Sequence, residues 1–167
     1  MLRRNVIALT KVAKVRSPCR HHHQCRQRSE RHPAAGDCRR TSGRPGETDA
    51  FNTPDFAAAV KATGREQMIV AGISADVCVA FAAQSAVAAG YQVHAVLDAS
   101  GTWNQLATQA AYSRLEKAGV TLNNTVAVAA ELQRDWRDKG GQELAGLMAA
   151  HAIPFYGSLL PYVTPAA

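Results

Sequence analysis

One cysteine, Cys78, stands where a thiol can act as a nucleophile. It follows the apolar run QMIVAGI at residues 67–73 and lies near the start of a helix predicted over residues 77–89. The first turn of a helix offers free backbone N–H groups and the positive end of the helix dipole, which lower the pKa of a thiol and can bind an oxyanion. This position indicates covalent catalysis by a thiolate. The alternative is that Cys78 is a small core residue that only packs.

A second group of reactive side chains lies in the segment 16–43, which contains RHHHQCRQRSERH at residues 20–32. Residues 16–44 hold eight arginines and two acidic residues, and therefore account for the whole net charge of +6. Charge alone supports only non-specific, salt-sensitive binding, so no specific nucleic-acid partner is expected. The spacing of its cysteines and histidines fits no known zinc site, so no metal site is predicted. These residues are Cys19, Cys25, Cys38, His21, His22, His23 and His32.

The elements that position Cys78 follow one another regularly after residue 53. Helices are expected over 53–63, 77–89, 105–118, 128–137 and 142–150, and strands over 67–73, 91–97 and 121–126. Gly64, Gly90 and Gly119 are expected to end the first three helices. Strands that alternate with helices in this way imply βαβ units and a parallel sheet, so the predicted fold class is α/β.

In parallel α/β sheets, ligands bind beyond the carboxyl ends of the strands. Two segments are expected there: GISADVCV at residues 72–79 and DASGTW at residues 98–103. The length of 167 residues suits one domain. The sequence shows no apolar run that could span a membrane and no secretory signal, so we predict a cytoplasmic protein without a membrane partner.

The stretch GISADVCVAFAAQSAVAAGYQVHAVLDASGTWN, residues 72–104, resembles the nucleophile region of the isochorismatase-like cysteine hydrolases. That family includes nicotinamidases, N-carbamoyl amidases and many bacterial hydrolases of unassigned substrate. The likeness runs from Arg44 to about Tyr156 and includes RPG, DFAAAVKATG and ELQRDWR. It implies a three-layer α/β fold with a Rossmann-like parallel sheet over residues 44–167. It also implies a small-molecule substrate, no cofactor and assembly into a homo-oligomer.

The resemblance assigns roles to particular residues. Cys78 corresponds to the nucleophile, which attacks an amide-like carbonyl and forms a thioester, and Arg44 corresponds to the basic member of the catalytic triad. The Ile73–Ser74 bond corresponds to the family's cis peptide, which directs the N–H groups of Ser74 and Cys78 at the oxyanion. Trp103 is a candidate pocket residue. The alternatives are a solvated surface charge for Arg44 and simple packing for Trp103.

The third member of the family's triad is an aspartate at the end of the first strand, where it acts as general base. No apolar strand followed by Asp precedes Arg44, so we expect this base to be missing and the sheet to be incomplete at its N-terminus. Residues 1–15 resemble a helix that follows the absent strand and are expected to be a remnant of it. Because loss of a general base costs orders of magnitude in rate, whether this chain is an active enzyme stays open.

The segment 16–43 is explained by a frameshift hypothesis. Synonymous codons for residues 20–40 can be chosen so that a frame shifted by one base encodes VITTSAASG followed by PNGTLLPEIAA, which resembles the strand and loop that the family has here. The segment would then be aberrant and disordered, bounded by two slips or sequencing errors. The alternative is a non-catalytic basic module that binds nucleic acid or metal through residues 16–43.

Overall fold

The computed structural model describes Asn5, Ala8, Leu9, residues 46–153, Phe155 and Ser158. Asn5, Ala8 and Leu9 are helical, and they come from the segment 1–15 that was expected to be a helix. The segment 16–43 and the candidate triad residue Arg44 lie outside the described residues. The three predicted domain segments therefore stay predictions.

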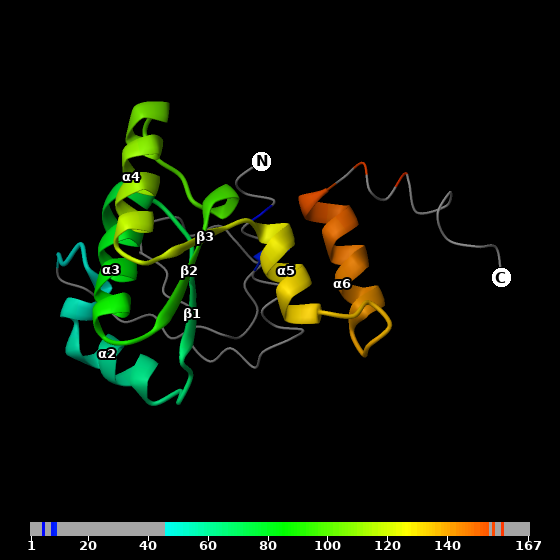
Figure 1. Cartoon of the computed structure of the whole chain (residues 1–167), viewed down its shortest axis with the longest axis horizontal. Coiled ribbons are helices and arrows are strands. Elements are labelled where there is room, and N and C mark those ends of the chain that lie inside the picture. Colours follow the sequence, from blue (N-terminus) through cyan, green and yellow to red (C-terminus); the bar gives the residue numbers. More distant parts are fainter. Residues whose placement is uncertain (1–4, 6–7, 10–45, 154, 156–157, 159–167) are drawn as a thin grey trace.

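A parallel sheet forms the centre of the described part of the chain (Figure 1). Its strands, in spatial order, are β1 (Gln67–Val70), β2 (Gln92–Val96) and β3 (Thr121–Asn123). Met68 pairs with Val93 between the first two strands, and Ala95 pairs with Leu122 between the second and third. The parallel sheet and the alternation of strands with helices confirm the predicted α/β class.

Helices cover both faces of the sheet, giving three layers. The described helices are α2 (Pro54–Lys61), α3 (Ala80–Ala88), α4 (Gln105–Lys117), α5 (Thr125–Gln133) and α6 (Gly141–Leu147), and a short 3-10 turn, η1 (Ala50–Asn52), precedes α2. Figure 1 shows α3 and α4 on one side of the sheet and α5 with α6 on the other.

Each face of the sheet has its own apolar core. On the first face, three fully buried alanines of α3 let that helix lie close to Val93 and Ala95 of β2 and to Leu115 of α4. On the second face, Val96 and Ala99 pack against Val128 of α5. Alternate residues of β2 thus enter opposite cores, as the two-residue period of a strand requires. The three alanines of α3 are Ala80, Ala83 and Ala86.

Two of the three glycines that were predicted to end helices, Gly90 and Gly119, do so with a definite geometry. After α3, the Gly90 N–H donates to the Val87 carbonyl at 2.9 Å and the Tyr91 N–H donates to the Ala86 carbonyl at 3.0 Å. This pair of bonds is a Schellman motif, which needs a left-handed residue, and Gly90 supplies it with φ 91°. Gly119, with φ 85°, ends α4 in the same way. Both predictions are confirmed.

Some predicted boundaries are wrong, and capping explains the differences. The strand expected over 121–126 ends at Asn123, because the Asn124 side chain accepts a bond from the Ala127 N–H at 2.9 Å and starts α5 at Thr125. The helix expected to run to Arg137 ends at Gln133, because Arg134 has a positive φ of 62°. The run at residues 67–73, predicted to be a buried strand, forms only the short β1, whose Ile69 is 40% exposed.

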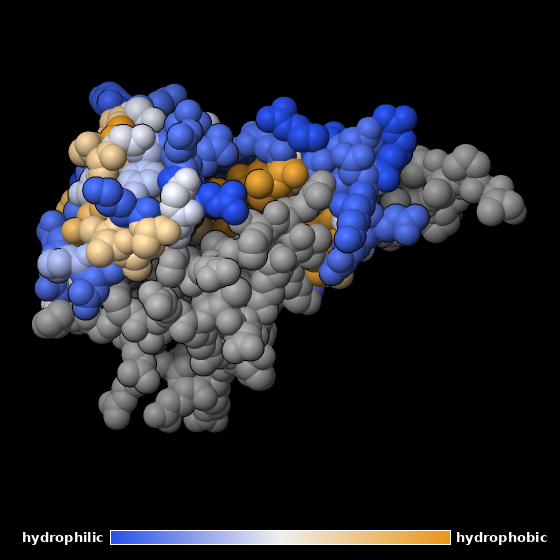
Figure 2. All heavy atoms as spheres, turned by 90° about the horizontal axis from the view of Figure 1, so that it is seen from below, coloured by the Kyte–Doolittle hydropathy of each residue, from blue (hydrophilic) through white to orange (hydrophobic). Residues whose placement is uncertain are grey.

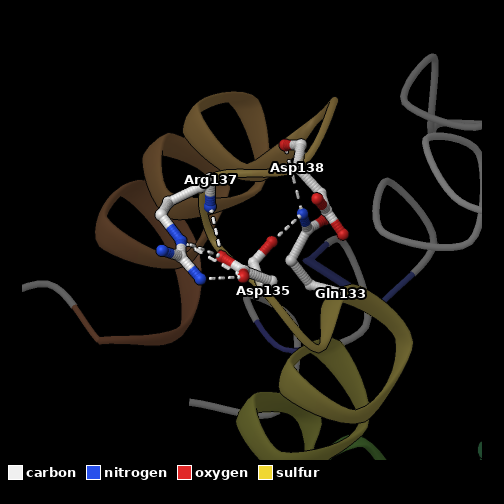
Figure 3. Close-up of polar contacts among 4 residues, drawn as sticks. All are labelled: Gln133, Asp135, Arg137 and Asp138. Atoms are coloured by element: carbon white, nitrogen blue, oxygen red, sulfur yellow. Dashed lines mark hydrogen bonds and ion pairs between the residues drawn. The ribbon is translucent and has the colours of Figure 1, made fainter.

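The connection between α5 and α6 is held by side chains that bond to its own backbone (Figure 3). The buried Gln133 amide donates to the carbonyls of Asp135 and Asp138, at 2.7 and 3.4 Å. Arg137 pairs with the Asp135 carboxylate at 2.6 Å, and this hydrogen bond lowers the pKa of Asp135 and raises that of Arg137. The fold of this loop brings the Trp136 carbonyl against Gly141 at the start of α6.

The helix α6 packs against α5. Leu144 and Met148 contact Ala129 of α5 in a small separate core, and α6 continues into a π-helical turn over Met148–Ala152. Figure 2 shows a group of strongly hydrophobic residues near the middle of the molecule, between a region of mixed hydropathy and a mainly hydrophilic one. The pair α5–α6 is thus joined to the sheet mainly through α5 and the end of β2.

Asp98, just after β2, ties that strand to the start of α5. One oxygen of the Asp98 carboxylate accepts hydrogen bonds from both the N–H and the hydroxyl of Thr125, each at 2.8 Å. Thr125 is fully buried. Asn5 adds a bond from its side-chain amide to the Asp98 carbonyl at 3.0 Å. The Asp98 side chain therefore caps a helix and joins two elements.

A Gly141→Ala substitution is expected to destabilise the chain by about 2 kcal/mol or more, because the new Cβ would lie 1.9 Å from the Trp136 carbonyl oxygen. The matched control is Gly146→Ala in the same helix, where nothing lies within 4 Å. This control should be stabilising by up to about 1 kcal/mol through helix propensity. Urea unfolding of both variants measures the difference. Equal stabilities would contradict the close approach of the α5–α6 loop to Gly141.

A Thr125→Val substitution is expected to cost about 2 kcal/mol, because it removes one hydroxyl donor to a partly buried carboxylate and leaves the volume unchanged. Thr121→Val, on the exposed start of β3, is the control and should change stability by less than about 0.5 kcal/mol. Chemical denaturation of the two variants checks this. A Thr125→Val protein as stable as its control would show that the Thr125 hydroxyl contributes nothing to the link between Asp98 and α5.

Candidate active site

Cys78 lies in a π-helical turn, η2 (Ala75–Val79), that continues directly into α3. The turn begins two residues before the predicted helix start. The Ser74 carbonyl accepts the N–H groups of Val77 and Val79, at 3.4 and 3.0 Å. Cys78 is a free thiol and is partly buried. A π-helical turn is uncommon and is often found at functional sites.

The two segments predicted at the carboxyl ends of the strands lie together. Ile73 forms a parallel bridge with Gly101, and the Gly101 N–H donates to the Gly72 carbonyl at 3.0 Å. The Ser100 hydroxyl accepts from the Gly72 N–H at 3.3 Å and donates to the Val96 carbonyl at 2.7 Å. The pairing of β1 with β2 is thereby prolonged past the ends of both strands, up to the turn that carries Cys78.

The structure places four of the predicted site residues on this edge of the sheet. The bond between Ile73 and Ser74 is cis, the conformation that the family resemblance implies there. Ser74 is 5% exposed and its hydroxyl donates to the Asp76 carboxylate. Ile73 is 56% exposed and Trp103 is 73% exposed, so Trp103 does not pack into the core of this chain.

One residue of this region was missed from the sequence. Arg114, on α4, donates from Nη2 to the Asp76 carbonyl, and its guanidinium lies over the Phe81 ring at 5.2 Å from the ring centroid. An arginine within a helix is normally a solvated surface residue, so no sequence signal marks it. Only the packing of α4 against the turn η2 brings the side chain there.

Tyr112, also on α4, has a phenol group whose pKa is shifted by its surroundings. Burial raises the pKa of the Tyr112 phenol, and the negative charge of Asp98 raises it further. The thiol of Cys78 has no hydrogen-bond partner within the described ranges.

Two other kinds of site can be addressed for the described residues. Within them, no group of three or more His, Cys, Asp or Glu side chains is arranged to hold a metal ion. None of the described helices combines the length and apolar character needed to cross a membrane. The cysteines and histidines of residues 16–43 lie outside the described part.

Comparison with known proteins places these features in a family. The model of the isochorismatase domain matches residues 18–127. Probable hydrolase YcaC of Escherichia coli (strain K12) is 47% identical over 117 residues, which are 70% of this chain and 55% of that protein. Isochorismatase domain-containing protein 2 of Danio rerio is 36% identical over 94 residues, 56% of this chain and 47% of that protein. The chain thus spans about half the length of the curated relatives it matches.

Solved structures agree with this assignment. The YcaC gene product of Escherichia coli, described as an octameric hydrolase of unknown specificity, has a TM-score of 0.86 and 38% identity, covering 96% of this chain and 81% of that one. YcaC from Pseudomonas aeruginosa, solved with hexane-2,5-diol and covalent acrylamide, has a TM-score of 0.80 and 34% identity, covering 96% and 82%. Since the family model matches more than half of the sequence, this chain belongs to the isochorismatase family.

Proposed function

We propose that this chain is a cysteine hydrolase that acts on an amide-like C–N bond of a small molecule. The observation that carries the proposal is the position of Cys78. Its free thiol lies in the first turn after β1, at the carboxyl edge of the sheet, in a chain of the isochorismatase family. The match to this family gives no support to the alternative of a basic binding module on residues 16–43.

The proposed reaction has two halves. The Cys78 sulfur attacks the carbonyl carbon, and the C–N bond breaks as the amine leaves with a proton, which gives a thioester. Water then attacks the thioester, releasing a carboxylic acid and restoring the thiol. The N–H groups of Ser74 and Cys78 stabilise the oxyanion in both halves.

We further propose that the second half is slow in this chain. Hydrolysis of a thioester needs a base to activate water, and we expect the aspartate that has this role in the family to be missing from this sequence. The absence of the family's aspartate and the role of Arg44 as the basic member both stay predictions. The frameshift origin of residues 16–43 and the cytoplasmic location also stay predictions. On this basis the chain forms the acyl-enzyme faster than it releases it.

The relatives suggest the kind of substrate and assembly. The Pseudomonas aeruginosa structure holds covalent acrylamide, a small amide, and the Escherichia coli protein is an octamer. We propose for this chain a small-molecule substrate with an amide-like group, and assembly into a homo-oligomer. The exposed Trp103 stands beside the catalytic edge and is the proposed pocket residue.

The reaction of the full chain with p-nitrophenyl acetate tests the mechanism. We expect a burst of p-nitrophenolate close to one equivalent per Cys78, followed by slow turnover, because acylation needs only the thiolate whereas release needs the base. Stopped-flow absorbance measures the burst, and intact mass shows the added acetyl group. A Cys78→Ser protein should lose the burst.

The control for this experiment is Cys25→Ser, which removes a thiol from the segment 16–43. It should keep the full Cys78-dependent burst. A burst that survives in Cys78→Ser and falls in Cys25→Ser would contradict the assignment of the nucleophile. Fast steady turnover by the unaltered chain would contradict the proposal that thioester hydrolysis is slow. It would not affect the assignment of Cys78 as the nucleophile.

Homo-oligomer assembly gives a second prediction. Light scattering after size exclusion should give a mass several times that of one chain, because large apolar side chains such as Trp103 and Leu106 are left exposed on the single chain. A Trp103→Ser, Leu106→Ser double variant is expected to form smaller species. The control is Gln109→Ser, an exposed residue on the same helix α4. A single-chain mass at micromolar concentration would refute the proposed assembly.

A further inference from the structure

Arg114 makes two contacts that lie on either side of Cys78 in the sequence. Its Nη2 donates to the carbonyl of Asp76, two residues before the cysteine. Its guanidinium carbon lies 5.2 Å from the centroid of the Phe81 ring, three residues after the cysteine. One side chain on α4 thus contacts both the turn that carries Cys78 and the first part of α3.

Polar contacts from two neighbouring segments hold the backbone of the turn, in addition to its continuation into α3. Ser74 at its start makes no side-chain bond to the turn's N–H groups, and its hydroxyl bonds to the Asp76 carboxylate instead. On the other side, the turn is tied to the end of β2 by the bond from the Ala75 N–H to the Gly101 carbonyl, at 2.8 Å. The hydrogen bond from Arg114 to the Asp76 carbonyl connects the same turn to α4.

The surroundings of Arg114 indicate that the guanidinium is confined. Its Nε is buried and has no hydrogen-bond partner in the described part of the chain. Arg114 as a whole is half-buried, and leaving its buried Nε–H unpaired is costly. A planar guanidinium can donate to a carbonyl in its own plane while its flat face lies over a ring, and the ammonium of a lysine has no such flat face.

We propose that Arg114 is a positioning residue for the nucleophile: by holding the Asp76 carbonyl and the Phe81 ring together, it sets the direction in which the Cys78 thiolate faces its electrophile. The inference rests on the proposed role of Cys78. It concerns geometry and not the charge of Arg114, since the contacts that it makes are to a backbone carbonyl and a ring. Small displacements of a reacting group are enough to change rates greatly.

The test follows alkylation of Cys78 by acrylamide in the full chain, measured by mass spectrometry of the peptide that contains this cysteine, from pH 6 to pH 10. Arg114→Met should lower the Cys78 rate about tenfold, including at the high-pH plateau where the thiol is fully ionised. A loss at the plateau reflects orientation, whereas a change in ionisation alone would only move the midpoint of the profile. Arg114→Lys should recover less than half of the loss, because lysine keeps the charge but not the planar fork.

Matched variants separate positioning from stability. Arg134→Met removes another arginine that donates to a backbone carbonyl, that of Glu131 at 3.0 Å, far from Cys78 in the sequence, and should leave the Cys78 rate unchanged. Phe81→Leu keeps the bond to Asp76 but removes the ring, and should lower the plateau rate about threefold. Thermal melts show whether each variant is folded. If Arg114→Met does not fold, the Phe81→Leu plateau decides the question.

The outcomes distinguish this inference from the proposed function. If Cys78 of the unaltered chain reacts no faster than a thiol of the denatured chain, the nucleophile assignment fails and the inference fails with it. If Cys78 reacts fast and Arg114→Met keeps the wild-type plateau, or if Arg114→Lys restores it fully, only the positioning role is overturned. A reduced plateau with incomplete rescue by lysine supports it.

Discussion

The parallel pairing of β1 with β2 is the constraint on which the rest of the described structure depends. A parallel pair needs a crossover, and here the crossover is the turn η2 followed by α3. Both strands therefore end at the same edge, and the segments that follow them meet there. The bridge from Ile73 to Gly101 and the bonds of Ser100 continue that pairing beyond the strands. The backbone around Cys78 is thus set by the sheet and not by the loop itself.

The composition of α3 follows from the same constraint. A crossover helix must lie on the sheet, and its three fully buried alanines let it approach β2 closely, while larger side chains such as Leu115 of α4 fill the remaining space. The first residues of α3 continue the turn with Cys78, so the position of the thiol depends on how closely this helix packs. Burial of these small side chains contributes modestly to stability, but it sets how closely α3 lies to the sheet and therefore where the first residues of α3 are placed.

The elements on the opposite side of the sheet are joined by polar contacts as much as by apolar ones. Asp98 caps α5 through Thr125, and Val96 and Ala99 pack on Val128 beside it. The pair α5–α6 then rests on its own small core and on the bonded loop around Gln133. The site edge and this pair share the segment just after β2, where Ser100 bonds to Gly72 and Asp98 bonds to Thr125.

The α/β class, the helix stops at Gly90 and Gly119, and the place of Cys78 in the first turn of a helix could all be predicted from the residues alone. These features follow from local rules: strand and helix periods, the left-handed conformation that glycine adopts at no cost, and short connections. The resemblance to the family also predicted the cis peptide bond between Ile73 and Ser74, which the structure contains.

The ends of β3 and α5 were mispredicted because an asparagine cap and the positive φ of Arg134 overrode the apolar pattern. The exposure of Trp103 and the two contacts of Arg114 beside Cys78 emerged only in the folded chain. Both depend on which helix packs beside which, and contacts between segments distant in the chain leave no periodic signal in the sequence.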